Sequence, residues 1–117
     1  MRPSAGNIPR DDSPWAPYVP SAEAPWSLRR VVHLHRRAAF AAPWARLRRD
    51  WEEGPVAAVD RLLKPSRDPA FESMSQTIGD AAMASGSPGR LKAWWVYRML
   101  TSPDPLGERL TLMWHNH

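Results

Sequence analysis

The chain has 117 residues, 43% of them hydrophobic, and a net charge of +4 from 16 Lys and Arg against 12 Asp and Glu. It has no cysteine, which excludes disulfides and thiolate metal sites within it. No stretch reaches the roughly 20 apolar residues of a membrane-spanning helix, and residues 1–10 lack the apolar core of a signal peptide.

Residues 1–25 are rich in proline, which predicts an extended, poorly ordered arm rather than a helix. Within it, Trp15, Tyr18 and Val19 are expected to dock the arm onto a neighbouring surface of the same protein. The alternative is that the arm is a Pro-rich ligand for the aromatic groove of a partner. The prolines of the arm are Pro3, Pro9, Pro14, Pro17, Pro20 and Pro25.

The spacing of apolar residues predicts a helix over residues 27–39, with Ser27 as its N-cap. His35 falls on the apolar face and is expected to be a hydrogen-bonded core residue. His33 falls on the opposite, basic face and is expected to be solvated. The apolar face comprises Leu28, Val31, Val32, His35, Ala38 and Ala39. The basic face comprises Arg29, Arg30, His33, Arg36 and Arg37.

A second helix is predicted over residues 43–53, with Pro43 in its first position and Gly54 at its end. Pro55 begins a third helix that runs to about Leu63 and should pack against the second as a helical hairpin or corner. The third helix is expected to bury Val56, Val59, Leu62 and Leu63. The second should present a solvated face of Arg46, Arg48 and Arg49, balanced by Asp50, Glu52 and Glu53.

Residues 64–89 are rich in Ser, Asp, Gly and Pro, so we expect mostly an exposed connector with a short helix near residues 78–83. Residues 90–101 predict a helix that is apolar on nearly every side, which is typical of the centre of a large protein. The chain also holds seven tryptophans, more apolar surface than a domain of this size covers readily. Both features favour the interpretation that the chain is the N-terminal piece of a larger protein. In this piece, the helix around Trp94 and Trp95 is expected to be partly exposed.

Asp104 and Pro105 predict the start of a last helix that runs towards His117. One face of this helix is expected to carry Leu106, Leu110, Met113 and His117. Roughly the opposite face is expected to carry Glu108, Leu112 and His115. Glu108 and Arg109 are expected to form a local ion pair. The sequence identifies no catalytic residue and no cofactor.

His115 and His117 are weak candidate metal ligands. On a regular helix they diverge by about 200° and cannot share a metal, but they could if the backbone becomes extended after Trp114. The spacing of a zinc-binding helix with histidines four residues apart is absent. The alternative is packing of the imidazoles on the helix face.

Three segments in order resemble a large bacterial family of uncharacterised proteins, the "domain of unknown function 1800" family. Residues 28–40 are similar to its opening helix and turn, 54–63 to its next helix, and 91–117 to its longest and most specific motif block. Two departures are Ala39 and Ala41, which stand where the family pattern has Gly and where a left-handed turn would favour Gly. The family motif positions in this chain are His33, Trp114, His115, Asn116 and His117.

The resemblance implies a mostly helical fold and frequent export, with no established activity. We therefore expect an all-α protein of several short helices, with residues 1–25 as the arm and 26–117 as the N-terminal portion of a larger helical domain, truncated at its C-terminus. Its function is interpreted as that of an envelope-associated or interaction protein, working with a protein partner or with the rest of the same domain.

Two alternative functions stay open. In the first, the chain is part of a metal-assisted hydrolase whose site is completed by residues beyond His117. In the second, it binds phosphate or nucleic acid weakly through Arg29, Arg30, Arg36 and Arg37. Acidic residues interspersed along the chain argue against nucleic acid as the main partner.

Overall fold

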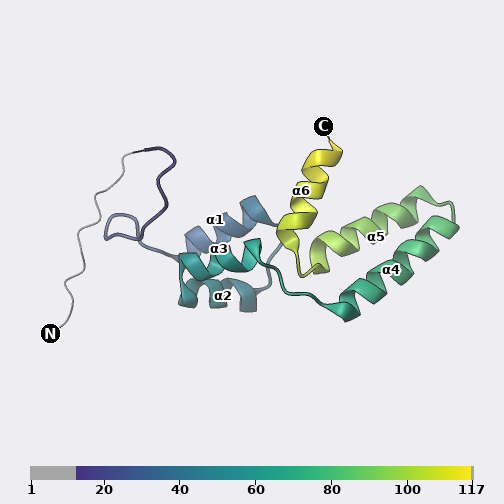
Figure 1. The fold of residues 1–117 in the computed structure, drawn as a ribbon, viewed down its shortest axis with the longest axis horizontal. Coiled ribbons are helices and arrows are strands. Elements are labelled where there is room, and N and C mark those ends of the chain that lie inside the picture. Colours follow the sequence, from purple (N-terminus) through teal and green to yellow (C-terminus); the bar gives the residue numbers. More distant parts are fainter. Residues whose placement is uncertain (1–12, 117) are drawn as a thin grey trace.

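The computed structural model describes residues 13–116, which form six α-helices and, within that range, no strand (Figure 1). The expected all-α fold is confirmed. The helices are α1 (Leu28–Ala38), α2 (Trp44–Glu53), α3 (Pro55–Leu63), α4 (Pro69–Ala84), α5 (Pro88–Thr101) and α6 (Pro105–His115).

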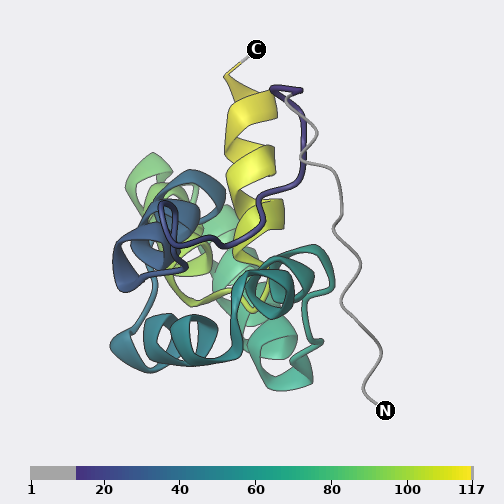
Figure 2. The same cartoon turned by 90° about the vertical axis from the view of Figure 1, so that its left-hand side faces the viewer.

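The helices form two groups that α6 joins. Helices α1, α2 and α3 pack on one another, while α4 packs only on α5 as a long hairpin. Helix α6 contacts α5 on one side and both α1 and α3 on the other. Figure 2 shows the first three helices in front and the hairpin behind them. The junction around α6 therefore sets how the two groups are held together.

Local signals start several helices. The side chains of Asp68, Ser87 and Asp104 each cap a helix that begins with proline, and Asp104 Oδ1 accepts from the Gly107 amide at 2.8 Å. Gly54 adopts a positive φ of 93° between α2 and α3, a conformation that glycine accepts without steric cost. Pro43 was expected inside α2 but occupies its N-cap position instead.

The predicted faces of α1 are confirmed. Val31, His35 and Ala39 are buried, while the five residues of the basic face are exposed. Ser27 stands at the N-cap, although its side chain makes no capping hydrogen bond. Ala39 has a φ of −142°, an extended conformation that any residue adopts, so alanine there causes no strain.

The prediction for α3 is confirmed for Leu62 and wrong for the other three residues. Val56, Val59 and Leu63 are exposed, Val56 by 76%, and the buried residues are Ala58 and Leu62. Helix α3 has two apolar stripes, and only one can face α1, α2 and α6. The stripe with Ala58 lets the helices approach closely, because alanine adds little side-chain bulk at the contact.

Residues 64–89 were wrongly expected to be mostly connector, because α4 alone spans 16 residues of them. The small residues that resemble a loop composition form a packing face. Ser75, Gly79 and Ala82 are all buried against α5, where the Trp94 indole lies directly over Gly79. Trp94 Nε1 donates to the Ser75 carbonyl at 2.7 Å, which satisfies the indole in this contact.

Helix α5 has no buried residue. It uses one side against α4 and another against α6, and leaves side chains such as Val96 and Leu100 in solvent. The expectation that this apolar helix stays partly uncovered is confirmed for the chain as given. Among the described residues, none of the helices has both the length and the apolar character to cross a membrane.

Candidate functional site: a groove beside a buried polar network

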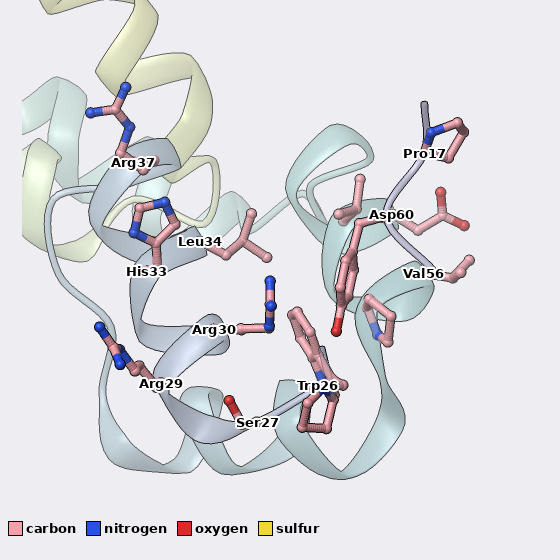
Figure 3. Close-up of a pocket in the computed structure, with 14 residues that line it drawn as sticks. Pro17, Trp26, Ser27, Arg29, Arg30, His33, Leu34, Arg37, Val56 and Asp60 are labelled. Atoms are coloured by element: carbon pink, nitrogen blue, oxygen red, sulfur yellow. The ribbon is translucent and has the colours of Figure 1, made fainter. Parts of the chain in front are cut away.

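A groove of about 1070 Å³ lies between the segment that precedes α1, the basic face of α1 and the beginning of α3. Figure 3 shows Arg30 and Leu34 projecting from α1 towards Trp26 and α3. The lining combines an apolar set, a cationic set and one carboxylate. The apolar set is Pro17, Tyr18, Pro25, Trp26, Leu34, Pro55, Val56 and Val59. The polar set is Ser27, Arg29, Arg30, His33, Arg37 and Asp60.

The segment before α1 is held at the groove by Tyr18. Its hydroxyl donates to the Ala24 carbonyl at 2.8 Å, and the Arg30 guanidinium lies 4.7 Å from its ring centroid. The ring also lies 6.1 Å from that of Trp26. The expected docking of Trp15 and Val19 is wrong, because Trp15 is 90% exposed and Val19 is also exposed. The remainder of the arm, residues 1–12, lies outside the described part of the chain.

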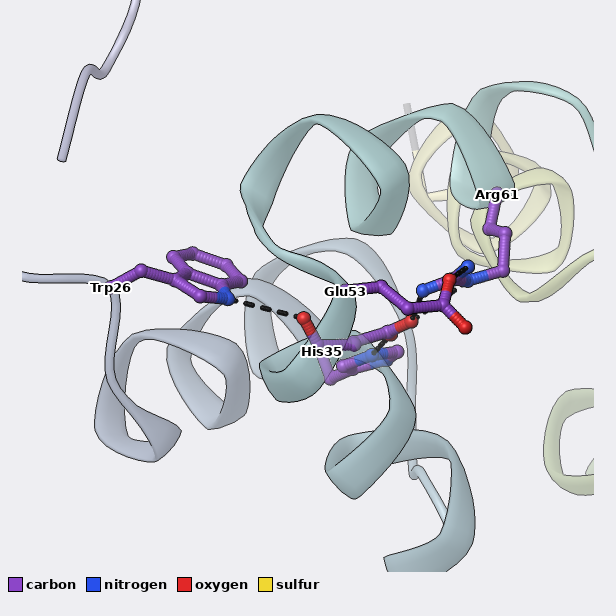
Figure 4. A network of polar contacts seen from close by, with 5 residues as sticks. Trp26, His35, Glu53 and Arg61 are labelled. Atoms are coloured by element: carbon purple, nitrogen blue, oxygen red, sulfur yellow. Dashed lines mark hydrogen bonds and ion pairs between the residues drawn. The ribbon is translucent and has the colours of Figure 1, made fainter.

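A buried polar network lies behind the groove and joins α1, α2 and α3 (Figure 4). His35 Nε2 lies 2.6 Å from Asp50 Oδ2, and Arg61 Nε donates to Asp50 Oδ1 at 2.8 Å. Arg61 also pairs with Glu53. Trp26 Nε1 donates to the Asp50 carbonyl at 3.1 Å, so one wall of the groove is anchored on this network.

The sequence-based predictions for His35 and Asp50 concern this network. His35 is a core residue with a partner, as predicted, although its Nδ1 atom is buried without a hydrogen bond in the described residues. Asp50 was wrongly assigned to a solvated face, since it is 1% exposed. Arg48, Arg49, Glu52 and Glu53 are exposed as predicted, and Arg48 pairs with Glu52 at 2.8 Å, while Arg46 is half-buried.

The electrostatics of the network favour a charged Arg61. Its partial burial alone would lower its pKa, but hydrogen bonds to Glu53 and Asp50, together with their charges, outweigh burial and raise the pKa above the usual arginine value. Asp50 thus lies between a permanent cation and an imidazole. The network connects side chains of α1, α2 and α3.

The C-terminal motif residues do not join the groove. The His115 ring packs edge-on against Trp95 at 5.0 Å between centroids, while Trp114 and Asn116 are exposed and His117 lies outside the described residues. Among the motif positions that the structure describes, only His33 lines the groove. In residues 13–116, no group of three or more His, Asp or Glu side chains is arranged to hold a metal ion.

Glu108 does not pair with Arg109, contrary to the prediction. It is buried and accepts from Arg98 Nη2 of α5 at 2.5 Å, while Arg109 lies over the Phe40 ring at 5.2 Å. Arg98 Nη1 also donates to Ser75 Oγ at 3.0 Å, so this arginine links α4, α5 and α6. The Arg98–Glu108 pair thus connects α5 to α6, the helix that joins the two groups.

The fold and the groove define a small all-helical protein with a concave, cation-rimmed surface. A family model described as "Protein of unknown function (DUF1800)" matches residues 33–117, most of the chain, and the chain therefore belongs to that family. The resemblance drawn from its motifs is confirmed. The comparisons with curated proteins and with solved structures gave no match.

Proposed function

We propose that this protein is an interaction protein that holds an acidic segment of a partner protein in the groove formed by α1, α3 and the Tyr18–Trp26 region. The supporting observation is the lining itself, where an apolar floor is rimmed by Arg29, Arg30, His33 and Arg37, with Asp60 as the single carboxylate among the described residues. We also propose that it acts in the bacterial envelope, in keeping with the frequent export implied by the family resemblance.

The apolar and the charged residues of the lining are expected to have different roles in binding. Buried aromatic and aliphatic anchors supply most of the binding free energy of a protein interface, and Tyr18, Trp26 and Leu34 offer such a floor. Charges at the rim select the partner and raise the association rate. An acidic segment with a few apolar side chains satisfies both parts, whereas a purely polyanionic ligand would leave the apolar floor uncovered.

Two neighbouring arginines of α1 allow a matched test. Arg37 lines the groove and Arg36 does not, although both are exposed and lie on the same helix. Peptides of about 12 residues are selected from a displayed random library on the wild-type protein, and their affinities are measured by fluorescence anisotropy. We expect enrichment of peptides with Glu or Asp beside Trp, Phe or Leu.

For these peptides, Arg37→Glu should weaken binding roughly tenfold, the effect expected for loss and reversal of one charge contact, and Arg36→Glu less than about twofold. Enrichment of basic or uncharged peptides would contradict the proposal. So would equal losses in the two variants combined with tighter binding of a single-stranded oligonucleotide, which would instead support a nucleic-acid surface on Arg29, Arg30, Arg36 and Arg37.

The envelope assignment is tested separately by fractionating bacterial cells that produce the protein from its own gene. We expect immunodetection of the protein in the envelope or periplasmic fraction. Recovery in the cytosolic fraction alone would refute that assignment without affecting the peptide-binding result.

A further inference from the structure

A second, smaller cavity lies on the network side of α3 and shares no lining residue with the groove. It has a volume of about 270 Å³ and is enclosed by α2, α3, the residues after α3 and the turn before α6. Its cationic lining is Arg46, Arg49, Arg61 and Lys64. We propose that this cavity binds a phosphate group, as the free ion or as a small phosphomonoester.

The charges around the cavity are unevenly compensated. Among the described residues, Asp50 is the only carboxylate in the lining, and it is already engaged by His35 and Arg61. Arg46 and Arg49 form no ion pair with any described residue, and Lys64 has only an exposed contact with Asp60 at 3.4 Å. Exposed pairs of that kind contribute little, so three cations are available to an incoming anion.

The available donors suit a tetrahedral oxyanion. Arginine presents a planar fork of N–H groups that matches two phosphate oxygens at once, and Arg46 and Arg49 bring two such forks to one cavity. The Ser66 hydroxyl also lines it. Pro103 and Pro105 also line the cavity and have no backbone N–H to donate, so the donors in the described lining are chiefly side chains.

An independent observation concerns His35, which lines the same cavity and is 3% exposed. Its Nε2 atom is engaged by Asp50, but its Nδ1 atom is buried without a hydrogen bond among residues 13–116. A buried polar atom without a partner destabilises the fold. The His35 imidazole, held by Asp50, therefore forms part of the buried wall of the cavity.

The test uses isothermal titration calorimetry with inorganic phosphate and, separately, glycerol phosphate, against chloride at matched ionic strength. Arg46→Ala/Arg49→Ala removes both free forks. Arg48→Ala is the control, because Arg48 lies on the same helix, is exposed and does not line the cavity. Circular dichroism and the unfolding temperature establish that all three proteins are equally folded.

We expect saturable phosphate binding by the wild type that weakens at least about tenfold in the double variant, since charge-assisted hydrogen bonds are the strong ones and two forks are lost. Arg48→Ala should change the Kd less than about twofold. Similar affinities for both probes would make the phosphate group itself the ligand, and tighter binding of glycerol phosphate would indicate a phosphomonoester. Binding no stronger than that of chloride, or equal losses in the double variant and the control, would overturn the proposal.

Discussion

An Asp50→Ala variant is expected to lose about 3 kcal/mol of unfolding free energy. The change leaves His35 with two unsatisfied ring nitrogens in the core and leaves Arg61 with Glu53 alone. Breaking a buried ion pair by removing one partner costs about 3–5 kcal/mol. The lower end applies because the Arg61 side chain is 28% exposed and can turn towards water.

The measurement is urea and thermal unfolding followed by circular dichroism at 222 nm. For a chain of this size, a loss of about 3 kcal/mol lowers the unfolding midpoint by roughly 12 °C or more. Glu52→Ala is the matched control, because it removes a carboxylate two residues away on the same helix that forms only an exposed pair with Arg48. That control should change stability by less than about 1 kcal/mol. Equal, small losses in both variants would show that the Asp50 network does not hold the three helices together.

A Gly79→Leu variant is expected to lose about 2 kcal/mol, even though leucine favours a helix more than glycine does. A Cβ atom at position 79 would lie 2.9 Å from Trp94 Cε2, closer than real contacts allow. The indole cannot easily move aside, because its Nε1 atom is bonded to the Ser75 carbonyl and Arg98 lies over the ring. Overpacking of this kind costs about 1–3 kcal/mol and outweighs a helix-propensity gain of just under 1 kcal/mol.

Gly89→Ala provides the comparison for this variant. A Cβ atom there would meet only Ser87 Oγ at 3.7 Å, an ordinary contact, so the α5 substitution should be neutral or slightly stabilising. Denaturant unfolding measures both variants, and the Trp fluorescence maximum reports opening of the α4–α5 hairpin. A Gly79→Leu protein as stable as wild type would mean that α4 and α5 are not held at the close distance seen at Trp94.

The two proposed sites share a structural basis. Trp26 lines the groove and donates to the Asp50 carbonyl, while Asp50 and Arg61 line the smaller cavity. The Asp50 network therefore positions one wall of each site. An Asp50 variant should disturb binding at both, whereas Arg37 and Arg49 each belong to one site only, which is why the proposed tests use the arginines.

Much of the chain could be interpreted from local signals. The two faces of α1, the turn at Gly54 and Pro55, and the start of α6 at Asp104 were predicted and are confirmed. These features depend on caps, prolines and periodicity, which act over a few residues and are visible in a single sequence. The motif blocks likewise identified the family that the family model confirms.

Other features could not be read from local patterns. Asp50 is buried because His35, 15 residues before it, and Arg61, 11 residues after it, converge on its carboxylate. The same holds for Glu108, which pairs with Arg98 of the neighbouring helix rather than with the adjacent Arg109. A charged side chain is buried only where an oppositely charged or hydrogen-bonding partner is present. The position of that partner depends on how the helices pack.

The sequence by itself determined the helical class, the family, and the basic and apolar faces of α1. Only the tertiary structure decided that α3 turns Ala58 inward and leaves Val56, Val59 and Leu63 exposed, that α4 is a helix with a small-residue face for Trp94, and that α1 and α3 enclose a groove. The physical reason is that helix propensity is local, whereas the choice between two apolar stripes depends on which one can pack closely against helices distant in the chain.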